Sequence, residues 1–176
     1  MRSLFSNLNG RLIIVNLLAF WFFFFAFQTF AFLHDYQFFN PLMERLNRLQ
    51  FPDRYKMDIT IIRQAGNFGI VAAYVIAWFT ASKRNWHWIN GVIAFVIAFA
   101  LGNTNWFGWD TLSPIFLAPG KLFGVNTVPS LVINGIILLA IGLLFLLLKK
   151  VNNFVNNGDP GYKKAVEADK KARRVS

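Results

Sequence analysis

The stretch that decides the fold is residues 12–33, LIIVNLLAFWFFFFAFQTFAFL, which contains no charged side chain. A helix needs about 20 predominantly apolar residues to cross the hydrocarbon core of a bilayer, and this stretch is long enough. It is too long for the apolar region of a secretory signal, which has roughly 7–15 residues, and no small-x-small cleavage site closes it. The sequence therefore predicts a retained first membrane span.

Three further apolar segments follow, at residues 65–82, 88–103 and 128–148. Of the 176 residues, 56% are hydrophobic and only 15% are charged, an apolar share above the roughly half that is usual for soluble domains. The sequence therefore predicts an all-α membrane protein. We expect a four-helix transmembrane domain in residues 1–150, followed by a basic cytoplasmic tail in residues 151–176.

The distribution of Lys and Arg favours an orientation with both termini inside the cell. That arrangement places 12 of the 18 cations inside, because they cluster at helix ends and in the tail, and leaves six outside. We therefore expect these cations to contact membrane lipids rather than nucleic acid.

The outer segment between the first two spans, residues 34–64, is predicted to form an amphipathic arm on the membrane surface. A short helix opened by Pro41 has three leucines on one face, namely Leu42, Leu46 and Leu49. Pro52 ends this helix. Apolar and polar residues then alternate through residues 55–63, a pattern typical of a short strand or an extended arm.

Two kinds of helix surface are visible in the spans. Small residues recur at every fourth position in the second span (Ala65, Gly69, Ala73, Ala77 and Ala81) and in the third (Ala94, Ala98 and Gly102). Such stripes predict close packing within the bundle, with a partner-protein interface as the alternative. The first span instead carries Phe and Trp on all sides between residues 20 and 27. It is therefore predicted to face lipid or a hydrophobic partner.

Composition excludes several kinds of chemistry. The chain has no cysteine, so it has no disulfide framework, thiolate zinc site or thiol redox centre. His34 is predicted at the outer end of the first span and His87 at the inner end of the third span. A hydrocarbon core of about 30 Å would separate them, so they cannot share one metal ion. We therefore expect neither a metal nor a cofactor. No ionisable residue lies well inside a span, which disfavours a pump or a coupled transporter.

Asp35 and Asp110 are the two carboxylates predicted where a span meets the outer surface. Two close carboxylates share a proton and act as an acid/base pair. The sequence does not bring these two together, so they are catalytic candidates only if the fold does.

Three short patches resemble motifs of the lipoprotein signal peptidases, also called signal peptidase II. These are four-span aspartic proteases of the bacterial inner membrane with both termini inside. The patches are ITIIRQAGNFG at residues 59–69, ALGN at residues 100–103, and the series Val125-Asn126, Ser130 and Gly135. They occur in the family's order and on one predicted side of the membrane, across about half of the chain.

The departures from the family concern its chemistry. The family places one catalytic aspartate three residues after each of the asparagines Asn103 and Asn126, and here those positions hold Trp106 and Pro129. Neither side chain can hold a water molecule and exchange protons with it. The resemblance therefore implies a protein that keeps the bundle and the arm but not hydrolysis.

Such a protein is expected to be a non-catalytic adaptor or complex subunit of the bacterial inner membrane. Its partner would be a membrane protein, a hydrophobic helix or a lipoprotein, with Arg63, Asn67, Asn103 and Asn126 as candidate polar contacts. For each of these four, helix capping or interhelical hydrogen bonding is the alternative role. A divergent aspartic lipoprotein signal peptidase that uses Asp110 with another outer carboxylate is the second hypothesis. A small channel or transporter is the third.

Overall fold

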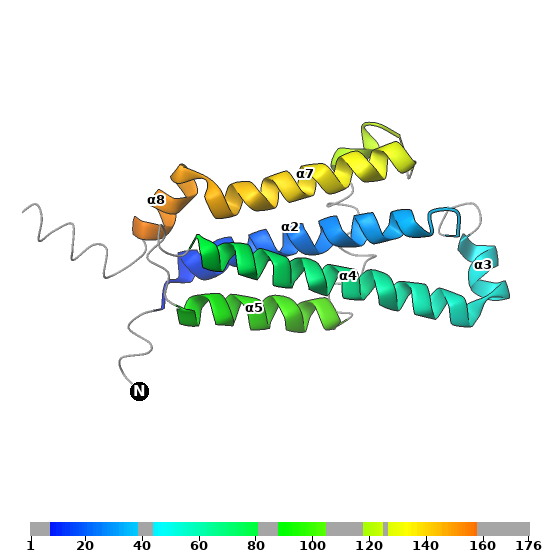
Figure 1. The fold of residues 1–176 in the computed structure, drawn as a ribbon, viewed down its shortest axis with the longest axis horizontal. Coiled ribbons are helices and arrows are strands. Elements are labelled where there is room, and N and C mark those ends of the chain that lie inside the picture. Colours follow the sequence, from blue (N-terminus) through cyan, green and yellow to red (C-terminus); the bar gives the residue numbers. More distant parts are fainter. Residues whose placement is uncertain (1–7, 39–43, 81–87, 105–117, 125–126, 158–176) are drawn as a thin grey trace, which may run out of the picture.

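The computed structural model describes residues 8–38, 44–80, 88–104, 118–124 and 127–157, and no strand occurs among them. The long helices run along an elongated bundle, each antiparallel to the long helix before it in the chain, and the short helices lie at the two ends (Figure 1). They are Gly10–His34 (α2), Glu44–Gln50 (α3), Pro52–Phe79 (α4), Trp88–Asn103 (α5), Val128–Leu147 (α7) and Lys149–Asn157 (α8).

Three of these helices, α2, α4 and α7, are long and apolar enough to cross a membrane. The chain is therefore a multi-pass membrane protein. Helix α5 has the bounds predicted for the third span, but it is shorter: its 16 residues rise about 24 Å, less than the roughly 30 Å of a hydrocarbon core. In Figure 1 it ends beside the middle of α4.

The expectation of a strand or extended arm at residues 55–63 is wrong, because this segment is part of α4. Pro52 does end α3, but it also occupies the first turn of α4, where a proline's missing N–H costs nothing. Three apolar residues of the segment share a helix face at intervals of four and three, and this face packs against Phe38: Tyr55, Ile59 and Ile62. The alternation of apolar and polar residues therefore did not indicate a strand, because the apolar residues that pack follow the period of a helix.

The expectation that the first span faces lipid is also wrong. Helix α2 packs against α4, α5 and α7, and its aromatic side chains form the core, with Phe20 and Phe25 almost completely buried. The reason is the small residues of the neighbouring helices. A Cβ added at Gly142 of α7 would lie 2.7 Å from the Phe23 ring, and one added at Gly66 of α4 would lie 2.6 Å from the Phe24 ring.

The small-residue stripes pack within the bundle, as predicted. Ala73, Ala77, Ala94 and Ala98 are fully buried in the same core as the α2 aromatics. At Gly69, α4 approaches the backbone of α2 so closely that an added Cβ would lie 2.6 Å from the Phe23 carbonyl oxygen. Large side chains on one helix therefore fill the space that small ones leave on the others.

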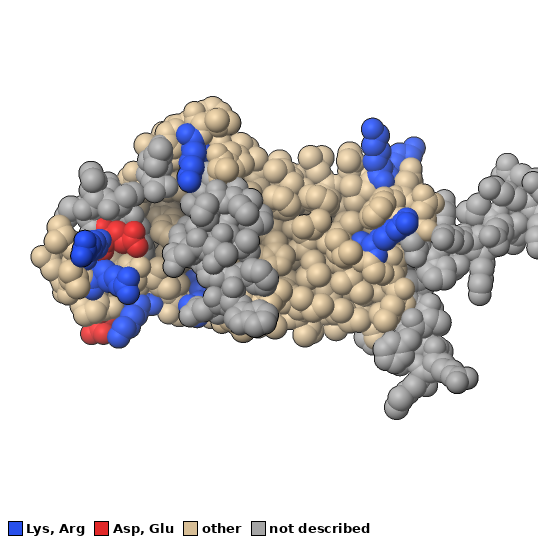
Figure 2. Space-filling model, turned by 180° about the vertical axis from the view of Figure 1, so that it is seen from behind, with Lys and Arg blue, Asp and Glu red and all other residues tan. Residues whose placement is uncertain are grey.

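The two ends of the bundle differ in polar chemistry. At the α8 end, the Asn9 backbone N–H donates to Asn90 Oδ1 (2.9 Å) and Asn9 Nδ2 donates to the Val155 carbonyl oxygen (3.1 Å), which joins the starts of α2 and α5 to α8. At the opposite end, which we call the α3 end, α3 lies beside the start of α4. On the face shown in Figure 2, the described charged residues gather at the two ends and leave an uncharged band between them.

Replacing Gly69 by Ala should push α4 away from α2. We expect the Tm in mild detergent to fall by roughly 2–10 °C, as for an overpacked core, despite the higher helix propensity of Ala. Gly10→Ala is the matched control, because nothing lies within 4 Å of a Cβ at Gly10. Equal changes in the two variants would contradict the proposed close contact.

Candidate functional site

Four of the six predicted site residues are described by the structure: Asp35, Arg63, Asn67 and Asn103. Asp110 and Asn126 lie outside the described residues, as does Trp106. Two of the four are brought together, since Asn67 of α4 donates from Nδ2 to Asn103 Oδ1 of α5 at 3.0 Å. For these two asparagines the structure shows the alternative role given above, an interhelical hydrogen bond.

The orientation of both amides is fixed by the backbone. Asn103 Nδ2 donates to the Phe99 carbonyl oxygen at 2.8 Å, so Asn103 presents its oxygen to α4. That oxygen requires a donor, so Asn67 must present its Nδ2, which also lies 3.4 Å from Gln64 Oε1. Asn67 Oδ1 is consequently turned towards the interior, 3.2 Å from where a Cβ on Gly102 would be.

Two amide oxygens at this place have no hydrogen-bond partner. Asn67 is 4% exposed and Gln28 of α2 is 7% exposed, and both Asn67 Oδ1 and Gln28 Oε1 are buried without a donor. The surroundings are apolar, because the Phe24 ring lies against both Gly66 and Gly102. An unsatisfied buried acceptor costs about 1–3 kcal/mol. We call Gln28, Gln64, Asn67 and Asn103 the amide cluster.

The amide cluster lies where α5 stops. Asn103 is the last residue of α5 and is exposed, whereas α2 and α4 both continue towards the α3 end. Gln28 lies six residues before the end of α2 at His34, which corresponds to about 9 Å along the helix. The cluster is therefore set back from the α3 end. Arg63, half-buried, lies one turn before Asn67 on the same side of α4.

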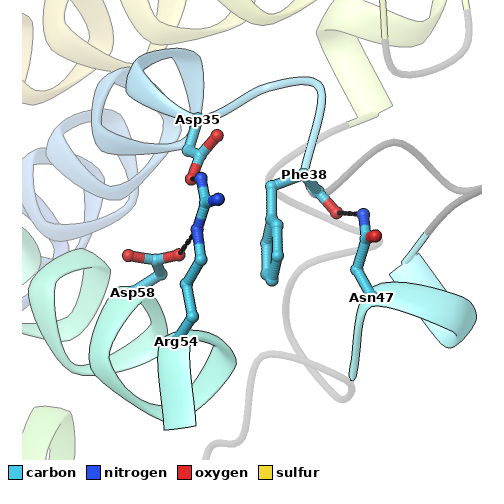
Figure 3. A network of polar contacts seen from close by, with 5 residues as sticks. All are labelled: Asp35, Phe38, Asn47, Arg54 and Asp58. Atoms are coloured by element: carbon cyan, nitrogen blue, oxygen red, sulfur yellow. Dashed lines mark hydrogen bonds and ion pairs between the residues drawn. The ribbon is translucent and has the colours of Figure 1, made fainter. Parts of the chain in front are cut away.

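Asp35 belongs to a different group, at the α3 end (Figure 3). It follows the last turn of α2 and accepts a hydrogen bond from Arg54 NH2 of α4 at 2.5 Å. Asp58 Oδ2 lies 3.6 Å from Nε of the same guanidinium, one turn along α4. The Arg54 guanidinium also lies over the Phe38 ring at 4.5 Å, and the Phe38 carbonyl oxygen accepts from Asn47 Nδ2 of α3 at 2.9 Å.

This group holds the arm at the α3 end against α2, and it places a cation rather than a second described carboxylate beside Asp35. Arg54 lies between the carboxylates of Asp35 and Asp58, where a dyad would hold water (Figure 3). The hydrogen bond with Asp35, and then the charges of Asp35 and Asp58, raise the pKa of Arg54, so the guanidinium remains protonated. Sequence reasoning missed Arg54 and Asp58, although their i, i+4 spacing was visible.

The start of α7 shows the roles of Ser130, from the third resembling patch, and of Pro129, at one of the family's aspartate positions. Thr127 caps the helix: its Oγ1 accepts from the Ser130 backbone N–H, and Ser130 Oγ accepts from the Thr127 backbone N–H at 3.0 Å. Pro129 occupies the first turn, where its missing N–H is not needed. Ser130 and Pro129 therefore start the helix, while Asn134 Oδ1 accepts from the Gly120 backbone N–H at 3.0 Å.

No family model, no curated protein and no solved structure matches this chain. The resemblance to the lipoprotein signal peptidases rests on its motifs alone. In the part of the chain that the structure describes, no three His, Cys, Asp or Glu side chains are grouped so that they could hold a metal ion.

Replacing Asn67 by Leu removes an unsatisfied acceptor and also the hydrogen bond to the exposed Asn103; these two effects offset, so the Tm without a partner should change little. Asn134→Leu is the matched comparison, since it removes an equally buried asparagine whose oxygen is satisfied. That variant leaves the Gly120 N–H without its acceptor and should lower the Tm by roughly 2–10 °C. Thermal unfolding in one detergent compares both, and a large loss for Asn67→Leu alone would show that Asn67 is only structural.

Arg54→Gln should loosen the arm, because Arg54 joins Asp35, Asp58 and Phe38. We expect faster backbone hydrogen exchange in α3 and in the first two turns of α4, with α7 unchanged. Arg45→Gln is the control, since Arg45 is exposed on α3. Unchanged exchange in Arg54→Gln would exclude this anchoring role.

Proposed function

We propose that this protein is a non-catalytic adaptor or complex subunit of the bacterial cytoplasmic membrane, with both termini inside. It binds a hydrophobic helix or a lipid-modified protein at the amide cluster. The single observation that carries the proposal is Asn67 Oδ1, which is buried, fixed in orientation and without a donor at the end of the short helix α5.

The chemistry of the cluster indicates the kind of group that it would bind. Two amide oxygens accept hydrogen bonds and offer no charge, so they suit an N–H or O–H group rather than an ion. In an apolar environment such a bond is stronger than in water, because water does not compete for it. The backbone N–H of a strained or terminal turn in a partner helix is one such donor, and the amide or hydroxyl of a lipid-modified residue is another.

The surface beside the cluster suits an apolar partner. Phe68, the next residue after Asn67, is 63% exposed, and Ile61 and Val71 on the same helix are exposed as well. Small and polar groups between helices are what holds helices together in a membrane, where burial of apolar surface gives little driving force. A partner helix, or the acyl chain of a lipid-modified protein, would pack on these residues, and the partner's N–H or O–H group would reach the buried Asn67 Oδ1 once the side chains that cover it move.

The proposal favours binding over catalysis because of the residues at the family's catalytic positions. Trp106 and Pro129 replace the two aspartates, and Pro129 is used to start α7. Asp35 is held by Arg54 instead of by a second carboxylate. The divergent peptidase that uses Asp110 stays the second hypothesis, and cleavage of a diacylglyceryl-modified prolipoprotein that is abolished in Asp110→Asn would establish it in place of the adaptor.

The adaptor reading predicts a stoichiometric protein partner that depends on Asn67. We expect the full chain, purified from its native membrane in mild detergent, to retain one such partner by quantitative mass spectrometry. Asn67→Leu should reduce its amount by roughly fivefold, the equivalent of about 1 kcal/mol for one hydrogen bond in a membrane. Asn153→Leu, an exposed position on α8, is the control. Equal retention by wild type and Asn67→Leu would remove the amide cluster from the interface.

A further inference from the structure

Among the residues that the structure describes, the α8 end of the bundle carries cations but no carboxylate. All carboxylates of the described residues belong to the α3 end, at Asp35, Glu44, Asp53 and Asp58, and both described ion pairs belong to Arg54. At the α8 end, Arg11, Lys149 and Lys150 are exposed. The space-filling view shows blue without red at this end (Figure 2). These cations are therefore available to an anion from outside the described chain.

One of these cations lies over an aromatic ring, and a second belongs to the helical turn before that ring. The Arg11 guanidinium lies over the Phe154 ring at 4.7 Å and donates from NH1 to the Phe154 carbonyl oxygen at 3.2 Å. Lys150 lies one turn before Phe154 on the same face of α8. The ring itself is half exposed. The bond to Phe154 uses one of the five guanidinium donors, so others are left for a ligand.

The position of this pair is fixed by the fold. Leu148 adopts an extended conformation between α7 and α8, and this turns α8 across the end of the bundle (Figure 1). Val155 of α8 is fully buried against Leu12 and Val15 of α2, and Asn9 Nδ2 holds the Val155 carbonyl oxygen. Arg11 and Phe154 therefore meet because their neighbours Leu12 and Val155 pack together.

An apolar path leads from this pair into the membrane. Leu18 lies two turns from Arg11 on the same side of α2, and Ile14 lies between them; both are exposed. A cation at the end of an exposed apolar stripe is the arrangement that suits a lipid, whose charged headgroup and acyl chains both find a matching surface. A water-soluble anion would use only the cations.

We propose that Arg11 and Lys150 bind the phosphate of an anionic phospholipid, whose acyl chains lie along Ile14 and Leu18. This site lies at the opposite end of the bundle from Asp35 and is separate from the amide cluster, so it does not depend on the proposed function. Because α8 contributes Lys150 and Phe154, the bound lipid bridges α2 and α8. The leaflet that contains such lipids is then the one that faces the α8 end.

The test is lipid retention by the full chain in detergent, measured by native mass spectrometry with dioleoylphosphatidylglycerol and, separately, dioleoylphosphatidylcholine. We expect the wild type to prefer the anionic lipid. The double variant Arg11→Gln/Lys150→Gln should weaken its binding by roughly 30-fold, since each cation near an anionic surface contributes a factor of about five. Arg11→Lys/Lys150→Arg should keep the preference, because it keeps both charges.

The matched control is Lys56→Gln/Lys121→Gln, which removes two exposed cations at the α3 end. An equal loss of anionic lipid in this control would overturn the proposal, because the loss would then depend on the net charge of the protein and not on the position of the two cations. Displacement of the lipid by millimolar glycerol 3-phosphate would overturn it too, since the site would then bind a soluble anion. A circular dichroism spectrum and a Tm for each variant show that the helices are intact.

Discussion

The structure depends on how closely the glycines of α4, α5 and α7 let those helices approach the aromatic helix α2. At Gly69 the approach is to the α2 backbone itself, and at Gly142 it is to the Phe23 ring. In a bilayer the lipid tails are as apolar as the side chains, so helices associate through close packing and hydrogen bonds rather than through burial from water. A helix as bulky as α2 is therefore central because its neighbours are small where they meet it.

Buried asparagine side chains join segments at two places in this bundle, and they differ in whether all their hydrogen-bonding groups have partners. At the α8 end, Asn9 has its oxygen on the Leu12 N–H and its nitrogen on the Val155 carbonyl, so the amide joins segments and is satisfied. At the end of α5, the Asn67–Asn103 bond joins two helices but leaves the Asn67 oxygen without a donor. The physical difference is that α5 stops there. A longer helix would cover the amides, whereas the short one leaves an exposed asparagine beside a buried, unsatisfied one.

The two ends of the bundle also differ in the charged residues that they carry. The α3 end holds cations and carboxylates together, and there Arg54 joins the start of α4 to the end of α2. The α8 end holds cations only, among the residues that the structure describes. At the first end, two carboxylates pair with Arg54 within the chain. The second end has no such pairing among the described residues, and in a membrane the headgroups of the surrounding lipids are a source of counter-charge.

The apolar segments, the bounds of α5 and the packing of the small-residue stripes could be predicted from the amino-acid sequence alone. These features follow from the length and composition of each apolar segment and from the spacing of its small residues, all of which are local properties of the sequence. Only the tertiary structure decided that α2 is central, that residues 55–63 are helical and that Asp35 is bound to Arg54. The reason is physical: burial, helical phase and charge partners depend on which surface lies opposite. Phe23 packs against Gly69 and Gly142, which belong to helices much later in the chain. Residues 55–63 are helical because a helix places Ile59 and Ile62 on one face, where they pack against Phe38.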